Sequence, residues 1–296
     1  MNLSTAPGFN ATARDLLALA KPNVTLLVLI TTAGGLWLAP GNLGWSALFA
    51  TLAGTVLVVA AANTLNCWWE RESDKHMART RNRPLPAGRL QPRTALALGF
   101  GLSLVSVPLL TMLVNPMTGL LAAIALLSYV LVYTPMKQLS PHAVIVGAIP
   151  GAMPPLMGWT AVTGHIEAPG LVLFGILFIW QIPHFIAISM YRQQEYDRAG
   201  IQTVPSKHGL VSARWQMIAW SLALVPVSVA LVPLGSAGTI YLVLAVALGI
   251  GLVGLAVRGL WAERPVAWAR TYFLYTLIYL TLLFAALLVD AGPLHA

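Results

Sequence analysis

The sequence predicts an all-α fold: a polytopic bundle of nine transmembrane helices, with a cytoplasmic N-terminus and the C-terminus on the opposite side of the membrane. Three observations predict it, namely the apolar composition, the number of apolar runs and the placement of the basic residues. Hydrophobic residues make up 58% of the 296 residues and charged residues 9%, whereas soluble globular proteins average about 25% charged residues. This composition excludes a separate soluble domain.

The apolar runs set the number of helices, because ~20 helical residues cross the ~30 Å hydrocarbon core of a bilayer. Residues 1–18 precede the first run and lack the basic start and the cleavage site of a signal peptide. We therefore expect a cytoplasmic tail over residues 1–18 and a single membrane domain over residues 19–296. A break at Asn115-Pro116 divides the third run from the fourth. In chain order the runs cover residues 23–40, 46–68, 94–114, 117–134, 142–162, 169–190, 215–233, 237–257 and 270–289.

The basic residues support this count independently. If the N-terminus is cytoplasmic, all 17 Lys and Arg residues fall on the cytoplasmic side of the membrane. The opposite loops offer only His165, Glu167, Asp290 and His295. This asymmetry fits the positive-inside rule, and a missed or extra helix would destroy it. The formal charge of +8 thus reflects membrane orientation, and it calls for no nucleic-acid partner.

The polar stretch from Asn63 to Arg89 follows the second run and holds three of the nine carboxylates and six of the seventeen basic residues. Asn66, Glu70 and Asp74 are four residues apart, so on a helix they would form one stripe of oxygen-bearing side chains. Oxygen ligands of this kind suit a hard cation. The stretch ends in R-P-L-P, where the prolines block helix continuation and predict a basic loop.

A second polar stretch, from Trp180 to Pro205, follows the sixth run. His184, Arg192 and Glu195 are separated by eight and three residues, which is close to whole helical turns, so we expect one face of the sixth helix to present them in series. Gln181 and His184 lie inside the apolar run. Polar or ionisable groups at that depth are functional-site candidates.

Structural explanations compete with these functional ones. Arginines near the membrane, such as Arg89, Arg93, Arg214 and Arg258, are explained by topology alone. His184 can equally be a hydrogen-bonding group between helices. The carboxylate stripe is harder to explain in this way, because carboxylates so close to lipid need partners.

Together the two stretches point to a reaction. Carboxylates and an amide can hold Mg²⁺ against a diphosphate, while Arg and Lys neutralise the remaining phosphate charge. Metal and cations would then stabilise a leaving diphosphate. Because this site lies under a bundle of lipid-facing helices, the substrate should carry an apolar tail. The residues therefore indicate intramembrane prenyl transfer.

The same residues resemble a known family. The pattern N-x-x-x-E-x-x-x-D, followed by M-x-R-T-R-N-R-P-L-P-A-G and spanning Asn66 to Gly88, is similar to the first acidic motif of the UbiA superfamily of membrane prenyltransferases. The motifs W-Q-I-P-H-F, E-Y-x-x-A-G and Y-T-P-M-K resemble its protohaem IX farnesyltransferase (haem O synthase) branch. In two places, Glu70 and Glu195, this chain has Glu where the family has Asp.

The resemblance implies transfer of a farnesyl group from farnesyl diphosphate to a vinyl group of haem b, giving haem O. It also implies a Mg²⁺ cofactor and an inner-membrane enzyme with its active site facing the cytoplasm. His184 becomes a candidate for contacting haem or orienting the reacting groups. The implied metal-binding residues are Asn66, Glu70, Asp74 and Glu195; the diphosphate-binding residues are Arg79, Arg83, Lys137 and Arg192; Asn63, Gln181 and Tyr196 are further candidates.

Two other functions stay open at this point. The nearer is a prenyltransferase with another acceptor, such as a quinone precursor or a chlorin. The farther is a non-catalytic transporter or haem-handling membrane protein, which would place ionisable residues deep in several helices along a pathway. The expected partners are farnesyl diphosphate, haem b and the lipid bilayer, with a haem A synthase-type enzyme as the protein partner to consider.

Overall fold

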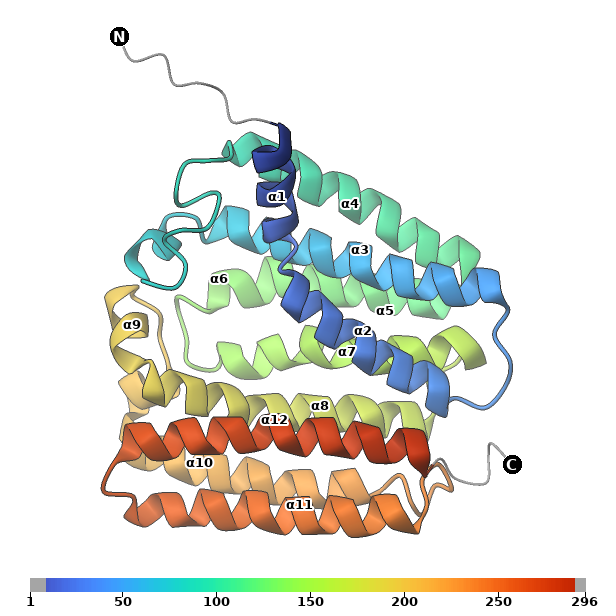
Figure 1. Cartoon of the computed structure of the whole chain (residues 1–296), viewed down its shortest axis with the longest axis vertical. Coiled ribbons are helices and arrows are strands. Elements are labelled where there is room, and N and C mark those ends of the chain that lie inside the picture. Colours follow the sequence, from blue (N-terminus) through green and yellow to red (C-terminus); the bar gives the residue numbers. More distant parts are fainter. Residues whose placement is uncertain (1–8, 291–296) are drawn as a thin grey trace.

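The computed structural model describes residues 9–290, and the side chains of residues 13–290. Its long helices run side by side in one bundle, while α1 lies across the end of α3 and the start of α4 at one edge (Figure 1). The helices are α1 (Phe9–Leu19), α2 (Pro22–Leu38), α3 (Trp45–Trp69), η1 (Ser73–His76), α4 (Pro92–Leu113), α5 (Pro116–Leu127), η2 (Ser128–Tyr133), α6 (Thr134–Met136), α7 (Ala143–Thr163), α8 (Ala168–Tyr191), α9 (Gln193–Arg198), α10 (Val204–Val229), α11 (Thr239–Arg258), η3 (Gly259–Trp261) and α12 (Pro265–Val289).

The predicted helical membrane bundle is confirmed within the described residues. Eight helices are long and apolar enough to cross a membrane, and they coincide with the second to ninth apolar runs. The first run corresponds to α2, which together with residues 13–19 of α1 forms a ninth candidate span bent by 51°. The expected tail of residues 1–18 lies partly outside the described residues, and its second half belongs to α1.

Two predicted helix starts were wrong. An apolar run is shorter than its helix where the helix extends into polar sequence. The helix predicted to begin at residue 215 is α10, which begins at Val204. Thr203 caps it by accepting a hydrogen bond from the Ser206 amide. Gly209, with φ of 79°, kinks this polar extension. The run predicted from residue 270 begins at Pro265, a residue type favoured in the first turn of a helix.

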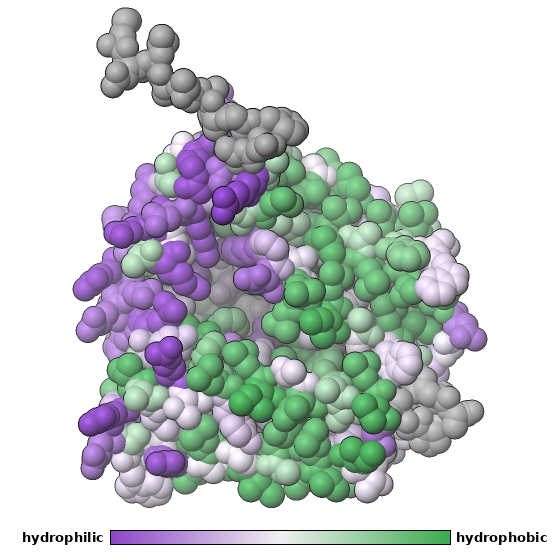
Figure 2. All heavy atoms as spheres, viewed as in Figure 1, coloured by the Kyte–Doolittle hydropathy of each residue, from purple (hydrophilic) through white to green (hydrophobic). Residues whose placement is uncertain are grey.

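The helices leave a polar end and an open wedge. The connections that follow α3, α6, α8 and α11 lie at the same end of the bundle, and hydrophilic residues gather there (Figures 1 and 2). Helix α2 runs obliquely across the bundle: it approaches α12 at the opposite end and diverges from it toward the polar end (Figure 1). Figure 2 shows a hollow in the surface where the two helices diverge.

Glycine allows α2 and α7 to pack with their backbones in contact. A Cβ atom on Gly35 would collide with the carbonyl of Pro155, and one on Gly158 would collide with the carbonyl of Thr32. Close approach of this kind is typical of helices in membranes, where small residues replace the hydrophobic effect as the basis of packing. The contact fixes the relative position of α2 and α7, which both line the cavity of the bundle.

We expect Gly158→Ala to destabilise the fold by about 1–3 kcal/mol, because the added methyl group meets backbone that cannot rotate away. The thermal unfolding temperature in detergent measures this. Gly101→Ala in α4 is the matched control, since a Cβ there meets nothing within 4 Å. Equal unfolding temperatures for the two variants would show that the α2–α7 contact is not close.

Candidate active site

A cavity of about 410 Å³ lies among α2, α3, α5, α7 and α8 and is reached from the polar end of the bundle. Its inner wall is apolar and its outer rim is polar. On α3, for example, the lining runs from Asn66 at the rim to Val58, eight residues or about 12 Å deeper. The cavity therefore combines a charged mouth with an apolar interior.

The three oxygen-bearing residues of the first polar stretch meet at the mouth. Asn66, Glu70 and Asp74 are all buried and all line the cavity. They do not share one helix, as the sequence had predicted, because α3 ends at Trp69 and Asp74 lies in the 3₁₀ helix η1. The amides of Glu70 and Asp74 nevertheless bond to the carbonyls four residues earlier, at 2.9 and 2.8 Å. The helical spacing thus continues past the end of the helix.

Each of these residues is paired with a cationic side chain. The Lys137 ammonium is 3.1 Å from Glu70 Oε1, and the Arg83 guanidinium is 2.8 Å from Asp74 Oδ2. The Lys21 ammonium donates to Asn66 Oδ1 at 2.8 Å. The mouth therefore holds three pairs of an oxygen-bearing and a cationic side chain, drawn from α3, η1, the loop that follows η1, the start of α2 and the end of α6.

The Lys137–Glu70 pair determines the charge state at the mouth. Burial acts to raise the pKa of Glu70, but Lys137 and Lys21 outweigh it and hold that pKa below its usual value. Burial likewise acts to lower the pKa of Lys137, and the Glu70 carboxylate reverses this and raises it. Both groups are therefore charged at neutral pH, and the charge of each offsets the cost of burying the other.

Lys21 is a member of the site that the sequence interpretation missed, because it counted this residue only as a topology signal. Lys21 links α1 to α2 and has φ of 51°, a left-handed conformation that no other non-glycine residue adopts within residues 9–290. Such a conformation is rare and costs energy for a residue with a side chain. The sequence did contain a feature that could have drawn attention to Lys21: this residue is charged and lies directly before Pro22, where the first apolar run begins.

The mouth fits Mg²⁺ as a partial set of ligands. Asp74 Oδ1 is buried and makes no hydrogen bond to the described residues, so it has a lone pair to offer. The described residues contain no cluster of three or more His, Cys, Asp or Glu side chains that could hold a metal alone. Mg²⁺ is commonly bound by one or two carboxylates together with substrate phosphates. Asn66, Glu70 and Asp74 match that pattern.

The second polar stretch is arranged differently from the prediction. Helix α8 ends at Tyr191 and α9 is a separate short helix, so His184, Arg192 and Glu195 do not lie on one continuous helical face. Arg192 is 3.2 Å from Glu195, and neither residue is among those that line the cavity. The break at Arg192, whose φ is −114°, separates the two helices.

His184 points away from the cavity toward α12. Its Nδ1 lies 2.7 Å from Thr276 Oγ1, and its ring stacks on Trp180 with centroids 4.5 Å apart. The hydrogen-bonding interpretation of His184 thus describes its place in the fold. Six other candidates from the sequence do line the cavity: Asn63, Arg79, Arg83, Lys137, Gln181 and Tyr196.

Comparison with known proteins places this architecture in a family. Residues 28–278 match the UbiA prenyltransferase family. The chain is 52% identical over 286 residues to a protein named Protoheme IX farnesyltransferase from Anaeromyxobacter dehalogenans (strain 2CP-C), covering 97% of each chain. It is 50% identical over 281 residues to the protein of the same name from Myxococcus xanthus (strain DK1622), covering 95% of this chain and 96% of the relative.

Solved structures agree on the fold at much lower sequence identity. A digeranylgeranylglyceryl phosphate synthase structure matches with a TM-score of 0.82 at 18% identity, covering 96% of this chain and 99% of that one. A UbiA homologue from Archaeoglobus fulgidus, bound to GPP and Mg²⁺, matches with a TM-score of 0.67 at 16% identity, covering 93% and 99%. The bundle, the cavity between its helices and the match over most of the chain lead to one conclusion: the chain belongs to the UbiA prenyltransferase family.

Proposed function

We propose that this chain transfers the farnesyl group of farnesyl diphosphate to a vinyl group of haem b, giving haem O. Two relatives of about 50% identity over nearly their whole length carry the name Protoheme IX farnesyltransferase, and this supports the choice of acceptor and donor. The observation that carries the reaction type is the cavity, with paired carboxylates and cations at its mouth and an apolar interior. We place the enzyme in the inner membrane with this mouth toward the cytoplasm, because hydrophilic residues gather at that end (Figure 2) and the positive-inside rule puts the Lys and Arg residues on the cytoplasmic side.

The charged mouth binds the diphosphate. Lys137 pairs with Glu70 and Arg83 pairs with Asp74. Both cations have further N–H groups that can donate hydrogen bonds to phosphate oxygens. Arg79 and Lys21 line the same mouth and add positive charge. Mg²⁺, when bound through Asn66, Glu70 and Asp74, supplies further charge against the leaving diphosphate.

The apolar interior holds the isoprenoid. At about 0.8 kcal/mol per buried CH₂ group, a fifteen-carbon chain gains on the order of 10 kcal/mol from burial, which is ample to keep it in the cavity. Val28, Val58 and Leu126 are among the residues that form this interior. They also exclude water from the carbon that becomes positive, so that the acceptor is not outcompeted by hydrolysis.

The bonding changes follow from this arrangement. The C–O bond to diphosphate breaks and the diphosphate leaves with the electron pair, stabilised by the cations of the mouth. The π electrons of the vinyl group form a new C–C bond to the farnesyl C1 atom. The positive charge then lies on the inner vinyl carbon, where the oxygen of a water molecule adds and a proton is released. The product carries a hydroxyl group and the farnesyl chain.

We assign the remaining candidates to the rim. Tyr196, which follows Glu195 on α9, lines the cavity, so Glu195 and Arg192 lie one residue or one turn from the mouth. We propose that they contact the metal–diphosphate group when their mutual ion pair opens. His184 orients the reacting groups by locking α8 against Thr276 of α12.

The decisive test supplies purified enzyme in membranes with haem b and farnesyl diphosphate, with and without Mg²⁺, and identifies products by mass spectrometry. We expect haem O only when Mg²⁺ is present. Full activity after chelation with EDTA would contradict a metal-assisted mechanism. Prenylation of 4-hydroxybenzoate in place of haem b would contradict the proposed acceptor, and no transfer to any acceptor would favour a non-catalytic role.

Asp74→Asn should lower kcat by roughly 10²–10³-fold, the usual cost of removing one group that stabilises charge at a reacting centre. Glu72→Gln is the matched control, because the Glu72 side chain is 69% exposed and lies two residues away. We expect that variant to retain nearly full activity. The unfolding temperature of both variants separates lost chemistry from lost folding, and comparable activities would contradict the role of Asp74.

Lys137→Met should leave the Glu70 carboxylate buried without its main counter-charge. In the unmodified protein the depressed Glu70 pKa means that its stabilising contribution persists from neutral pH down to about 4.3, the ordinary Glu value, and is lost only below it. In the variant burial raises that pKa, so stability falls as pH rises from 5 to 7. We expect a deficit of about 2 kcal/mol at pH 7, below the ~3–5 kcal/mol of fully buried pairs because the Lys137 side chain is 22% exposed.

Thermal unfolding in detergent at pH 5 and pH 7 measures this difference. Lys75→Met removes the same charge from an exposed pair with Glu72, and it should cost little at either pH. A Lys137→Met deficit that is equal at both pH values would show that the ionisation of Glu70 does not depend on Lys137.

A further inference from the structure

We propose that the outer face at the start of α12 holds the haem acceptor, with Arg264 and Arg270 pairing with its two propionate groups. This inference rests on the proposed function and identifies where the second substrate binds. The cavity of about 410 Å³ lies in the lower part of the ~300–1,000 Å³ range of single small-molecule sites. A farnesyl chain and a tetrapyrrole cannot both be enclosed there, so the acceptor needs a surface outside it.

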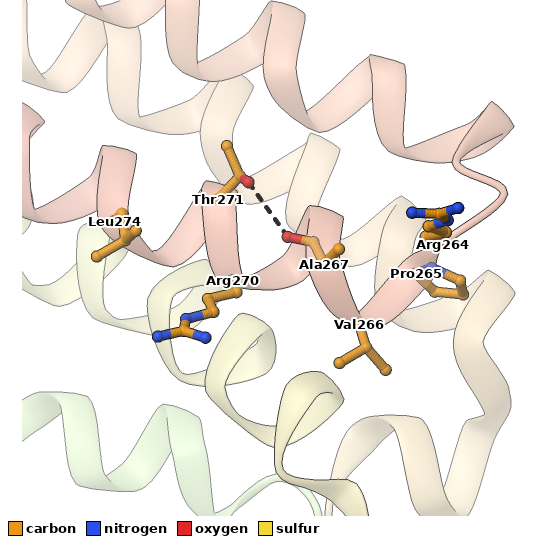
Figure 3. Close-up of a pocket in the computed structure, with 7 residues that line it drawn as sticks. All are labelled: Arg264, Pro265, Val266, Ala267, Arg270, Thr271 and Leu274. Atoms are coloured by element: carbon orange, nitrogen blue, oxygen red, sulfur yellow. Dashed lines mark hydrogen bonds between the residues drawn. The ribbon is translucent and has the colours of Figure 1, made fainter.

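Such a surface is present as a depression of about 570 Å³ on the first turns of α12. Figure 3 shows Arg264 at one end, Arg270 further along the helix, and Val266 and Leu274 forming its apolar part. Val266 is 59% exposed and Leu274 is 50% exposed. The depression therefore offers an apolar floor with a cationic side chain at two points.

The two guanidinium groups are available to a ligand. Among residues 13–290, neither Arg264 nor Arg270 makes a side-chain hydrogen bond or ion pair. Arg83, by contrast, pairs with Asp74, and Arg214 donates to the carbonyls of Leu260 and Ala262. The positive charges of Arg264 and Arg270 thus suit an anionic ligand that lies on the apolar surface beside them.

A row of packed aromatic rings connects this depression to the cavity. Phe273, next to Leu274 on α12, packs against His184 with ring centroids 4.9 Å apart. His184 in turn contacts Phe185, which is 42% exposed and also lines the cavity. A ligand lying over Leu274 and Phe185 would reach from the arginines to the cavity, within the wedge where α2 diverges from α12 (Figure 1).

The chemistry of haem b matches this layout. It is a flat apolar macrocycle with two carboxylates on one edge and two vinyl groups on the opposite edge. When Arg264 and Arg270 hold the carboxylate edge at the polar end of α12, the vinyl edge points past the exposed Leu274 and Phe185 toward the cavity. The same contacts would select a tetrapyrrole with free propionates over an acceptor of equal ring size that lacks them.

The test compares haem b with its dimethyl ester, in which both propionates are neutral, as ligands and as acceptors. The double variant Arg264→Leu with Arg270→Leu is examined beside Arg258→Leu, an exposed arginine at the end of α11. Spectroscopic titration of haem gives affinity without requiring turnover, and calorimetric titration with farnesyl diphosphate checks that the mouth is intact.

We expect the unmodified enzyme and Arg258→Leu to bind haem b at least tenfold more tightly than the ester, since a charge-assisted pair contributes about that factor. The double variant should bind the two ligands equally, with unchanged affinity for farnesyl diphosphate. Retained discrimination in the double variant would overturn the proposal. Failure of the unmodified enzyme to prenylate haem b would instead overturn the proposed function, and the binding data would separate the two results.

Discussion

Pairing of charged groups in an apolar surrounding is the constraint on which the site depends. A carboxylate or ammonium group at the edge of a membrane bundle is stable only with a partner, because desolvation without one is costly. Glu70 and Lys137 meet this requirement between the end of α3 and the end of α6, and Asp74 of η1 meets it with Arg83 of the loop that follows η1. These pairs place cations and oxygens next to one another before any substrate binds.

The helix packing places these charged pairs at the opening of an apolar cavity. Backbone contact between α2 and α7 at Gly35 and Gly158 fixes one side of the cavity, while the divergence of α2 from α12 leaves the other side open toward the polar end. The result is an apolar interior that opens to the charged mouth, beside the hollow where the two helices diverge (Figure 2). A substrate with a long hydrocarbon chain and a diphosphate head matches both environments at once.

The second polar stretch has a different place in this scheme. The helix break at Arg192 places Glu195 on the separate helix α9, outside the cavity lining, and His184 faces Thr276 and Trp180 rather than the cavity. These contacts join α8 to α12, and the neighbouring Phe185 is 42% exposed and lines the cavity. In the proposed function, donor chemistry belongs to the surface of α3, η1 and α6, and acceptor docking to the neighbouring surface of α8 and α12.

The sequence by itself determined the helical bundle, its runs and the Asn66, Glu70 and Asp74 spacing, because apolar length and helical period are local properties. It could not show that Lys21 reaches Asn66 across 45 residues, or that His184 meets Thr276 across 92. Those contacts depend on which helices pack together and at what angle. Only the tertiary structure therefore decided which polar residues share the cavity and which join one helix to another.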